Sequence, residues 1–295
     1  MIAGSRFGFQ MATKTVFPGV EFLSGFFMVI RMTSWNGFFS LLFLPTLAWP
    51  LPTAAGELIN FAEDTASNYH HGWTSGSNGG YGFNPWRLAA QHGAENSYAG
   101  FFIARAEDQP DLQNISHRHA FGLYANGVEF EEAVAIRPFQ QALKPGEAFS
   151  VLVEHARIRT DGDEDRKPGS LGLVLRTGAA AESTADFDRG ARFQVVYREG
   201  EETYRVIDGE TGEGWDTEVP VTENGWELTF ILREEDRYDL QVRTLEDDNL
   251  REWTDRRLGG ESGAAIESAA FFNLNAEPRD LYLEGLQLNR KATPR

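Results

Sequence analysis

The sequence contains no cysteine among its 295 residues, so no disulfide can stabilise the fold. An oxidising compartment is therefore tolerated but not exploited, and stability must come from a hydrophobic core. Basic residues are also scarce, because 27 Lys and Arg stand against 44 Asp and Glu, for a net charge of −17. Phosphate backbones and anionic lipid surfaces are bound by basic stripes. The composition therefore argues against nucleic acid as a partner.

Several motifs on which enzyme classes depend are missing as well. The chain has no G-x-S-x-G, no cysteine nucleophile, no phosphate-cradling G-x-x-x-x-G-K and no dinucleotide fingerprint. The nearest approach to the paired carboxylates of a glucanase is "EFEEAV" from Glu129, where Glu131 and Glu132 would lie on opposite faces of a strand. We assign no catalytic residue, and the sequence favours a protein that is not an enzyme.

Metal-binding patterns are weak. His117 and His119 would share one face of a strand, as in some zinc sites, but two histidines that flank an arginine are more often a solvated strand edge, and no metal ligand is assigned. The acidic run "DGDEDRKPG" from Asp161 has Arg166 where an EF-hand loop needs glycine and Gly172 where it needs glutamate. A looser Ca²⁺ site between strands stays open as a hypothesis, and no other cofactor is indicated.

The first fifty residues differ from the rest of the chain. An apolar run at Phe22–Ile30 is followed by Arg31, a second apolar run at Phe38–Trp49, and small residues up to Ala55. Neither run reaches the roughly 18 apolar residues of a spanning helix. The order of charge, apolar stretch and small residues predicts a secretory signal cleaved after Ala55, with a membrane anchor as the alternative.

This pattern divides the chain into two parts. Residues 1–55 are predicted to be a signal peptide and an over-read N-terminal extension, with Met28 or Met32 as the true start. Residues 56–295 are predicted to form a single domain of a size that all-β sandwiches often reach. The expected location is outside the cell, at its surface or in the periplasm, with no membrane insertion after signal cleavage.

Two-residue periodicity dominates after Gly56. "WELTFILR" and "RYDLQVRT" alternate apolar and polar residues and predict one antiparallel hairpin, and "RFQVVYRE" and "TYRVID" predict a second one around Gly200. Glu246–Arg257 is predicted to be a helix or a charged loop that returns to a strand at Trp253, and Gly285 a bulge. Further strands are expected at Leu58–Ala62, Gly100–Arg105, His119–Ala125, Ala133–Pro138, Phe149–Ile158, Leu171–Arg176, Ser268–Leu274 and Leu281–Leu288.

Such strands must each bury one face. The usual solution is two antiparallel sheets stacked face to face. The predicted fold class is therefore all-β, a two-sheet antiparallel sandwich of the jelly-roll kind.

The stretch Gly72–Trp86, "GWTSGSNGGYGFNPW", combines glycines with aromatic side chains. The glycines predict a tight, irregular loop, and Asn78 before Gly79 is a turn signal. In one interpretation the indoles plug the open end of the sandwich and are structural. In the other, Trp73, Tyr81, Phe83 or Trp86 forms an apolar platform for a sugar ring, and Asn78 and loop amides bond its hydroxyls.

Three blocks, "NYHHGWTSGSNGGYGFNPWRL", "FGLYANG" and "FFNLNAEPRDLYLEGLQL", resemble a group of uncharacterised secreted bacterial β-sandwich proteins. That group shares a W-T-x-G-x-N-G-G-x-G-F-x-P-W block near the mature N-terminus. The resemblance spans nearly all of residues 56–295. More distantly, the sequence pattern is similar to concanavalin A-like lectin and glucanase jelly rolls. It implies a concanavalin-like sandwich, but a fold alone says little about function.

We therefore carry three functional hypotheses. The first is an exported, non-catalytic sandwich that binds extracellular or cell-surface carbohydrate through Trp73, Asn78, Tyr81, Phe83 and Trp86. The second is a structural or adhesive surface protein that takes no small ligand. The third is a polysaccharide hydrolase whose carboxylates would come from separate strands.

Overall fold

The computed structural model describes residues 58–93, 98–109, 112, 114–115, 119–126, 130–155, 168–178, 183–212, 214–276 and 280–291. All of them belong to one compact unit, Ala54–Arg295. The predicted signal peptide, His117 and the Asp161–Lys167 part of the acidic run lie outside the described residues, so those predictions stay open. Among the described residues, no helix has the length and apolar character that crossing a membrane requires.

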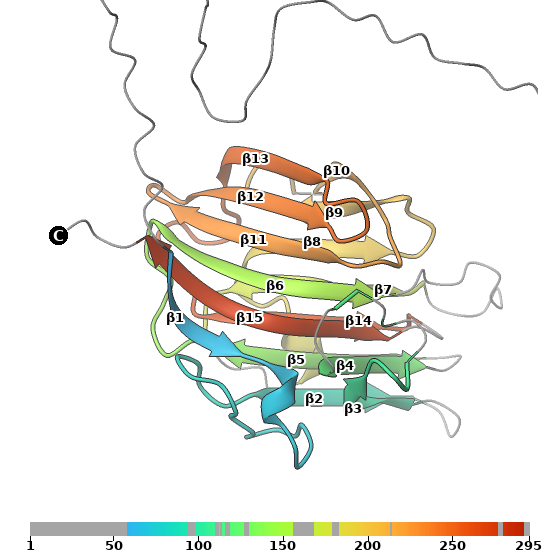
Figure 1. The fold of residues 1–295 in the computed structure, drawn as a ribbon. Coiled ribbons are helices and arrows are strands. Elements are labelled where there is room, and N and C mark those ends of the chain that lie inside the picture. Colours follow the sequence, from blue (N-terminus) through green and yellow to red (C-terminus); the bar gives the residue numbers. More distant parts are fainter. Residues whose placement is uncertain are drawn as a thin grey trace, which may run out of the picture. The chain divides into compact units, whose positions relative to one another are not determined.

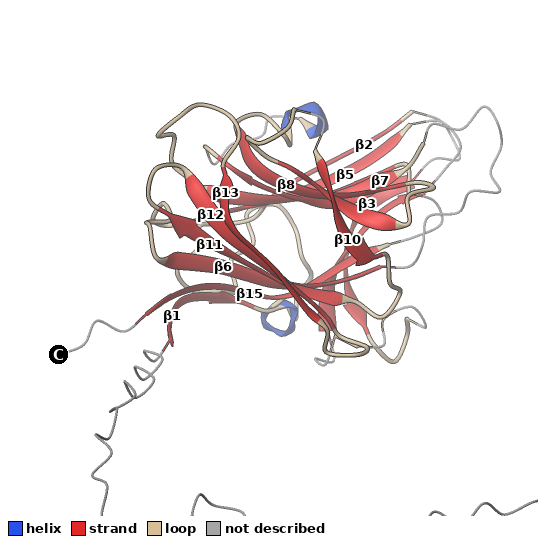
Figure 2. Ribbon diagram, turned by 90° about the horizontal axis from the view of Figure 1, so that it is seen from above, coloured by secondary structure: helices blue, strands red, loops and turns tan. Residues whose placement is uncertain are grey.

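The described residues form fifteen strands in two sheets, and every strand pairing is antiparallel. Figure 2 shows the two layers facing each other. The eight-stranded sheet runs in the order β13 (Leu250–Arg257), β12 (Arg237–Thr244), β11 (Trp226–Arg233), β6 (Glu147–His155), β15 (Leu281–Lys291), β4 (His119–Asn126) and β3 (Tyr98–Arg105), with β1 (Leu58–Asp64) also paired to β15 (Figure 1).

The seven-stranded sheet lies behind it in Figure 1 and is also antiparallel. Two 3₁₀ turns, η1 (Ala66–Asn68) and η2 (Thr184–Asp186), complete the described elements. The order of this sheet is β10 (Trp215–Pro220), β9 (Thr203–Ile207), β8 (Ala191–Arg198), β7 (Ser170–Arg176), β14 (Ser268–Leu274), β5 (Glu131–Pro138) and β2 (Arg87–His92). The predicted all-β, two-sheet antiparallel sandwich is therefore confirmed.

The core between the sheets follows from the alternation in the sequence. Along β11, Trp226, Leu228, Phe230 and Leu232 are buried, while the residues between them are partly exposed. Because strand side chains alternate between faces, one apolar face of β11 meets the other sheet. The predicted hairpin of β11 and β12 is in register, with Phe230 opposite Leu240, and is confirmed.

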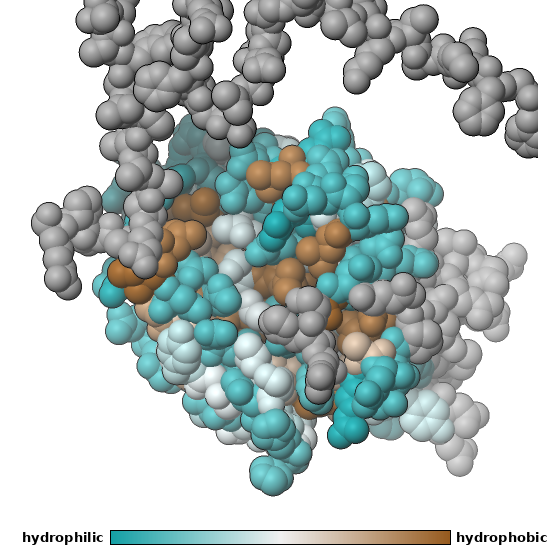
Figure 3. All heavy atoms as spheres, viewed as in Figure 1, coloured by the Kyte–Doolittle hydropathy of each residue, from teal (hydrophilic) through white to brown (hydrophobic). Residues whose placement is uncertain are grey.

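The centre of the seven-stranded sheet is buried on both faces. In β14 the apolar residues read "AAFF" without alternation, because its outer face is also covered by a second cluster that includes Val134, Val174, Phe272 and Phe187. Strands covered on both sides read as continuous apolar runs. The face of the eight-stranded sheet in Figure 3 is different, since its hydrophobic surface lies in separate patches among hydrophilic side chains.

Some local predictions needed correction. The segment Glu246–Arg257 is not a helix: a turn leads into strand β13, which starts at Leu250, before the return that was expected at Trp253. Strands β2 and β10 were not predicted, because "RLAAQH" and "WDTEVP" lack a clear apolar alternation. The bulge at Gly285 is confirmed, since its φ is +61° and the register shifts between Glu284 and Gln287.

Candidate functional site

A buried aspartate holds the glycine-rich segment in place. Asp64, at the end of β1, accepts hydrogen bonds from the Tyr69 hydroxyl at 2.8 Å and the Trp86 indole N–H at 2.9 Å. It also lies 2.7 Å from a guanidinium nitrogen of Arg137 on β5, and both side chains are fully buried. We call Asp64, Tyr69, Trp86 and Arg137 the Asp64 cluster. It ties both sheets to the segment that joins β1 to β2.

Arg137 extends this network into the glycine-rich loop. Its guanidinium donates to the backbone oxygen of Asn84 at 2.5 Å and to the side-chain oxygen of Asn78 at 2.7 Å. It also lies 5.1 Å from the ring centroids of both Phe83 and Trp86, within the range of a cation–π contact. The loop is therefore fixed from inside the protein by one cation.

The glycines allow the loop to approach β1 closely. A Cβ on Gly80 would lie 2.4 Å from the backbone oxygen of Glu63, and one on Gly82 would lie 2.3 Å from the Cβ of Ala62. Gly82 also has a φ of +74°, a conformation that side chains disfavour. Tyr81 forms a backbone bridge to Glu63 between these two glycines. The predicted tight, irregular loop is confirmed, and its glycines are needed for close packing.

The burial of the loop aromatics corrects the predicted sugar platform. Phe83 and Trp86 have no exposed surface and Trp73 only 4 %. Trp73 packs edge-on against Trp86, with ring centroids 5.0 Å apart. A sugar ring must reach the face of an aromatic ring, so Phe83 and Trp86 cannot serve as the platform. Phe83 and Trp86 stabilise the fold by burying their aromatic surface in the core.

The other two predicted site residues differ from these. Tyr81 is 52 % exposed, and its hydroxyl lies 3.5 Å from a Glu63 carboxylate oxygen. Asn78 is exposed, and its amide group donates to the backbone oxygen of Phe83 at 3.3 Å while accepting from Arg137. Asn78 is thereby occupied within the loop. The structure does not bring the five predicted residues together on one open surface.

Burial changes the acidity of the cluster. It raises the pKa of Asp64, against the opposing effects of the Arg137 charge and the two hydrogen bonds. Burial and the nearby Asp64 charge raise the pKa of Tyr69 to about 12, so this hydroxyl stays a donor. Glu284 on β15, also buried, accepts from the backbone N–H of Ala66 at 2.9 Å, and burial raises its pKa to about 8.

The open site lies beside this cluster, at one edge of the sandwich. η1 and the residues after it lie next to β4 and β3 (Figure 1) and leave a groove of about 490 Å³. We call it the edge groove. Its lining comes from two stretches of chain, Ala66, Ser67, Tyr69, His70, Gly72, Trp73 and Thr74 on one side and Phe101, Phe102, Ile103, Arg105 and His119 on the other.

The groove combines an apolar floor with a polar rim. Phe101 is partly exposed and lies 5.5 Å from Trp73, ring centroid to ring centroid, in an edge-on arrangement. Arg105 follows Phe101 and Ile103 on the same face of β3 and stands opposite His119 in the strand register. The predicted site residues include Trp73 but not Phe101, Arg105 or His70, because only the pairing of β3 with β4 and the packing of η1 beside β4 place them together.

A second hollow, of about 460 Å³, lies near Leu143, Leu232, Leu258 and Ile266. None of the described residues that line it is aromatic. Its main charged group is also occupied, because Asp236 pairs with Arg192 and accepts from the Ser262 hydroxyl and the Gly263 N–H. The edge groove is the better candidate for ligand binding.

The opposite edge of the sandwich repeats the chemistry of the Asp64 cluster. Asp208 accepts from the Tyr238 hydroxyl at 2.5 Å and from the Trp215 indole N–H at 2.9 Å, and Arg256 lies 3.7 Å away. Arg256 also covers the Trp215 ring at 4.3 Å. At each edge, a buried aspartate thus contacts a tyrosine, a tryptophan and an arginine. This repetition supports a structural role for the Asp64 cluster and for the group around Asp208.

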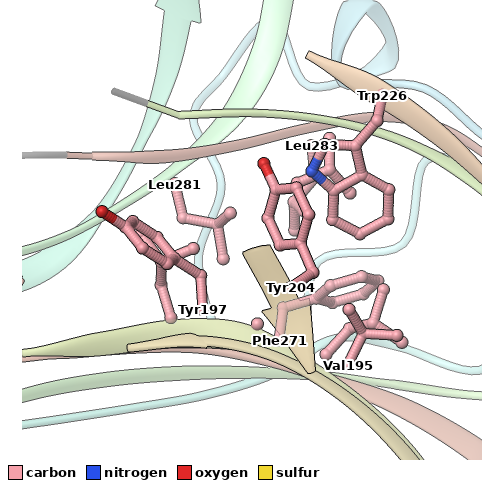
Figure 4. A pocket seen from close by; sticks show the side chains of 11 residues that line it. Val195, Tyr197, Tyr204, Trp226, Phe271, Leu281 and Leu283 are labelled. Carbon is pink, nitrogen blue, oxygen red and sulfur yellow. The ribbon is translucent and has the colours of Figure 1, made fainter. Parts of the chain in front are cut away.

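The space between the sheets is nearly filled. A cavity in the core is lined by residues of both sheets, and Tyr204 lies between Tyr197 and Trp226 there (Figure 4). The Tyr204 hydroxyl lies 2.9 Å from Nε2 of His155, whose ring stacks on Tyr197. The remaining volume for the centre of a water molecule is about 10 Å³, enough for about one water. This cavity is too small for a sugar.

The described residues contain no group of three or more His, Asp or Glu side chains arranged to hold a metal ion. His119 lies in β4, and its predicted partner His117 lies outside the described residues. Glu131 and Glu132 are neighbours on β5; Glu131 is buried and Glu132 partly exposed. These two carboxylates do not face each other.

No protein-family model matches the chain, and none of the curated proteins matches it. Among solved structures, the chain is similar to a protein of unknown function with a galectin-like fold from Bacillus subtilis, at 11% identity and a TM-score of 0.38, covering 71% of this chain and 90% of that one. It is also similar to a legume lectin-like domain from Entamoeba histolytica (10% identity, TM-score 0.37, 67% and 91%) and to lectin UEA-II complexed with galactose (7% identity, TM-score 0.40, 70% and 92%).

Proposed function

We propose that this protein is an exported, non-catalytic β-sandwich that binds carbohydrate in the edge groove. The observation that carries the proposal is the groove itself, where the partly exposed Phe101 and the underlying Trp73 form an apolar floor. Its volume of about 490 Å³ falls in the usual range of ligand sites, about 300–1,000 Å³. The finer assignments, a concanavalin-like jelly roll and secretion, belong to the same proposal.

The rim supplies the groups that sugar hydroxyls need. Ser67 and Thr74 offer hydroxyls, His70 and His119 offer imidazoles, and Arg105 offers a fork of donors. An apolar floor with a few convergent polar groups is typical of small-ligand sites. The floor would contact the C–H face of a sugar ring, and the rim would bond its hydroxyls.

The binding test uses Phe101, which forms part of the floor and is only partly buried. The purified protein is passed through native gels that contain laminarin, methyl-esterified pectin, polygalacturonate or alginate, and its retardation is measured. We expect retardation by at least one polymer, reduced about tenfold in affinity in Phe101→Ala, because an aromatic contact of about 1 kcal/mol or more is lost. Tyr81→Ala, an exposed aromatic outside the groove, is the matched control and should bind as the original protein does.

A structural or adhesive role without a small ligand is the second candidate. It is favoured by the complete burial of Phe83 and Trp86, because these two aromatic side chains then serve packing alone. Absence of retardation by all four polymers would favour this role over carbohydrate binding. Release of reducing sugar from any of them would instead support the hydrolase hypothesis.

A further inference from the structure

The charges around the edge groove differ from those of the protein as a whole. The chain has 44 acidic and 27 basic residues. Among the described residues that line the groove, however, there is no aspartate or glutamate, and the ionisable side chains other than Tyr69 are His70, Arg105 and His119. The groove therefore presents donors and positive charge on a protein that is otherwise strongly acidic.

Arg105 differs from the eight described arginines that pair with a carboxylate. Carboxylates within 4 Å are available to Arg137, Arg189, Arg192, Arg205, Arg233, Arg237, Arg243 and Arg256. In the described part of the chain, the side chain of Arg105 has neither a hydrogen-bond nor an ion-pair partner. Its five donors are thus available to a ligand.

The buried carboxylate that bonds the lining residue Tyr69 does not cancel this charge. Asp64 lies under the segment that forms one wall, but it is fully buried and paired with Arg137 at 2.7 Å. On β3 the face that carries Phe101 and Ile103 ends at Arg105, with His119 directly opposite. A ligand seated on Phe101 would therefore meet a guanidinium and an imidazole at the same end of the groove.

From these observations we propose that the glycan bound in the edge groove is acidic, with a carboxylate that pairs with Arg105. This inference rests on the proposed function and narrows its ligand to a polyuronate. A guanidinium binds a planar carboxylate through two parallel hydrogen bonds, which an ester of the same sugar cannot reproduce. His119 and His70 supply further donors along the rim.

The experiment compares two forms of one polymer. Retardation of the purified protein is measured in polygalacturonate and in fully methyl-esterified pectin, which keeps the sugar but removes the charge, with alginate as a second acidic polymer. We expect at least tenfold tighter binding to an acidic polymer than to the esterified one. Arg105→Gln should lose about tenfold in affinity for the acidic polymer, Arg105→Lys should lose less, and Arg257→Gln, an exposed arginine on β13, should lose nothing.

The outcomes separate failure of the acidic-ligand proposal from failure of carbohydrate binding itself. If the protein binds the esterified and the acidic polymers equally, or binds only laminarin, carbohydrate binding stands and the acidic ligand is excluded. Equal binding of polygalacturonate by Arg105→Gln and the original protein would also overturn the role of Arg105. If no polymer retards the protein, both proposals fail. Melting temperatures of all variants verify that they are folded.

Discussion

At the scale of single residues, the main feature is the set of charged groups buried beneath the glycine-rich loop. Asp64 and Arg137 are far apart in sequence and compensate each other without exposure to solvent. Breaking such a pair leaves one buried charge uncompensated, which costs about 3–5 kcal/mol. Glu284 lies in the same region without a cationic partner among the described residues, and its Oε1 has no hydrogen-bond partner there. Burial without a compensating cation therefore raises its pKa.

Glu284 makes stability depend on pH in a defined direction. Its pKa is about 8 in the folded protein against 4.5 ordinarily, so between these values unfolding releases a proton. The contribution of Glu284 to the free energy of unfolding should therefore be fully present below about pH 4.5. It should be lost as the pH rises from there through about 8. Asp64, whose pKa is also raised, adds a fall of the same sign.

Glu284→Gln should remove most of this dependence, because the amide keeps an acceptor for the Ala66 N–H but cannot ionise. At pH 8.5 the variant should be more stable than the original protein by a few kcal/mol, since one pKa unit corresponds to about 1.4 kcal/mol. Urea unfolding at pH 5.5, 7.0 and 8.5 measures the slope, and Glu234→Gln, an exposed carboxylate, is the control. Parallel curves for the original protein and Glu284→Gln would exclude this account.

At the scale of elements, the segment from Gly72 to Trp86 packs closely against β1 and contributes aromatic side chains to the core. Its backbone approaches β1 where Gly80 and Gly82 leave room, and the rings of Trp73, Phe83 and Trp86 pack into the core. Trp86 is both a packing group and a donor to Asp64. The segment therefore contributes stability through rings that point inward, while the same fold brings Trp73 under the edge groove.

Variants of two aromatics from this segment should separate the two roles. Trp86→Ala should lower the free energy of unfolding by about 3–5 kcal/mol through lost packing, besides removing a donor to Asp64. Tyr81→Ala should change it by less than about 0.5 kcal/mol, because this side chain is half exposed. Chemical denaturation followed by far-UV circular dichroism measures both values. Equal losses in the two variants would contradict the assignment of Trp86 to the core and Tyr81 to the surface.

At the scale of the whole described domain, stability comes from one core shared by two sheets. Phe230 of β11 lies 5.1 Å from Phe193 of β8, ring centroid to ring centroid, across the space between them. Tyr238 of β12 stacks on Phe230 at 5.2 Å. Because these rings join both sheets, we expect the two sheets to unfold together rather than one after the other.

Phe230→Ala should cost about 3–5 kcal/mol of the free energy of unfolding, because it empties the centre of this core. Ile231→Ala changes the next residue, which is partly exposed on the opposite face of β11, and should cost about 1 kcal/mol. Unfolding is followed by tryptophan fluorescence and circular dichroism together, and coincident curves are expected. Two separate transitions would show that the sheets are independent.

The sequence by itself determined the fold class, because two-residue alternation in strands such as β11 and β12 needs nothing beyond neighbouring residues. It also determined the loop character of Gly72–Trp86, since glycine permits conformations that other residues avoid. It could not predict β2 and β10, which lack a clear alternation. It predicted the strand β14 but not that this strand is buried on both faces.

Only the tertiary structure decided which aromatics face inward and which residues form the site. Trp86 is buried because Asp64 and Arg137, from two different sheets, surround it, and no local pattern in the sequence reveals that pairing. Phe101, Arg105 and His70 meet in the edge groove because β3 pairs with β4 beside η1. Contacts between distant segments depend on how the sheets stack, and this is set by the whole core.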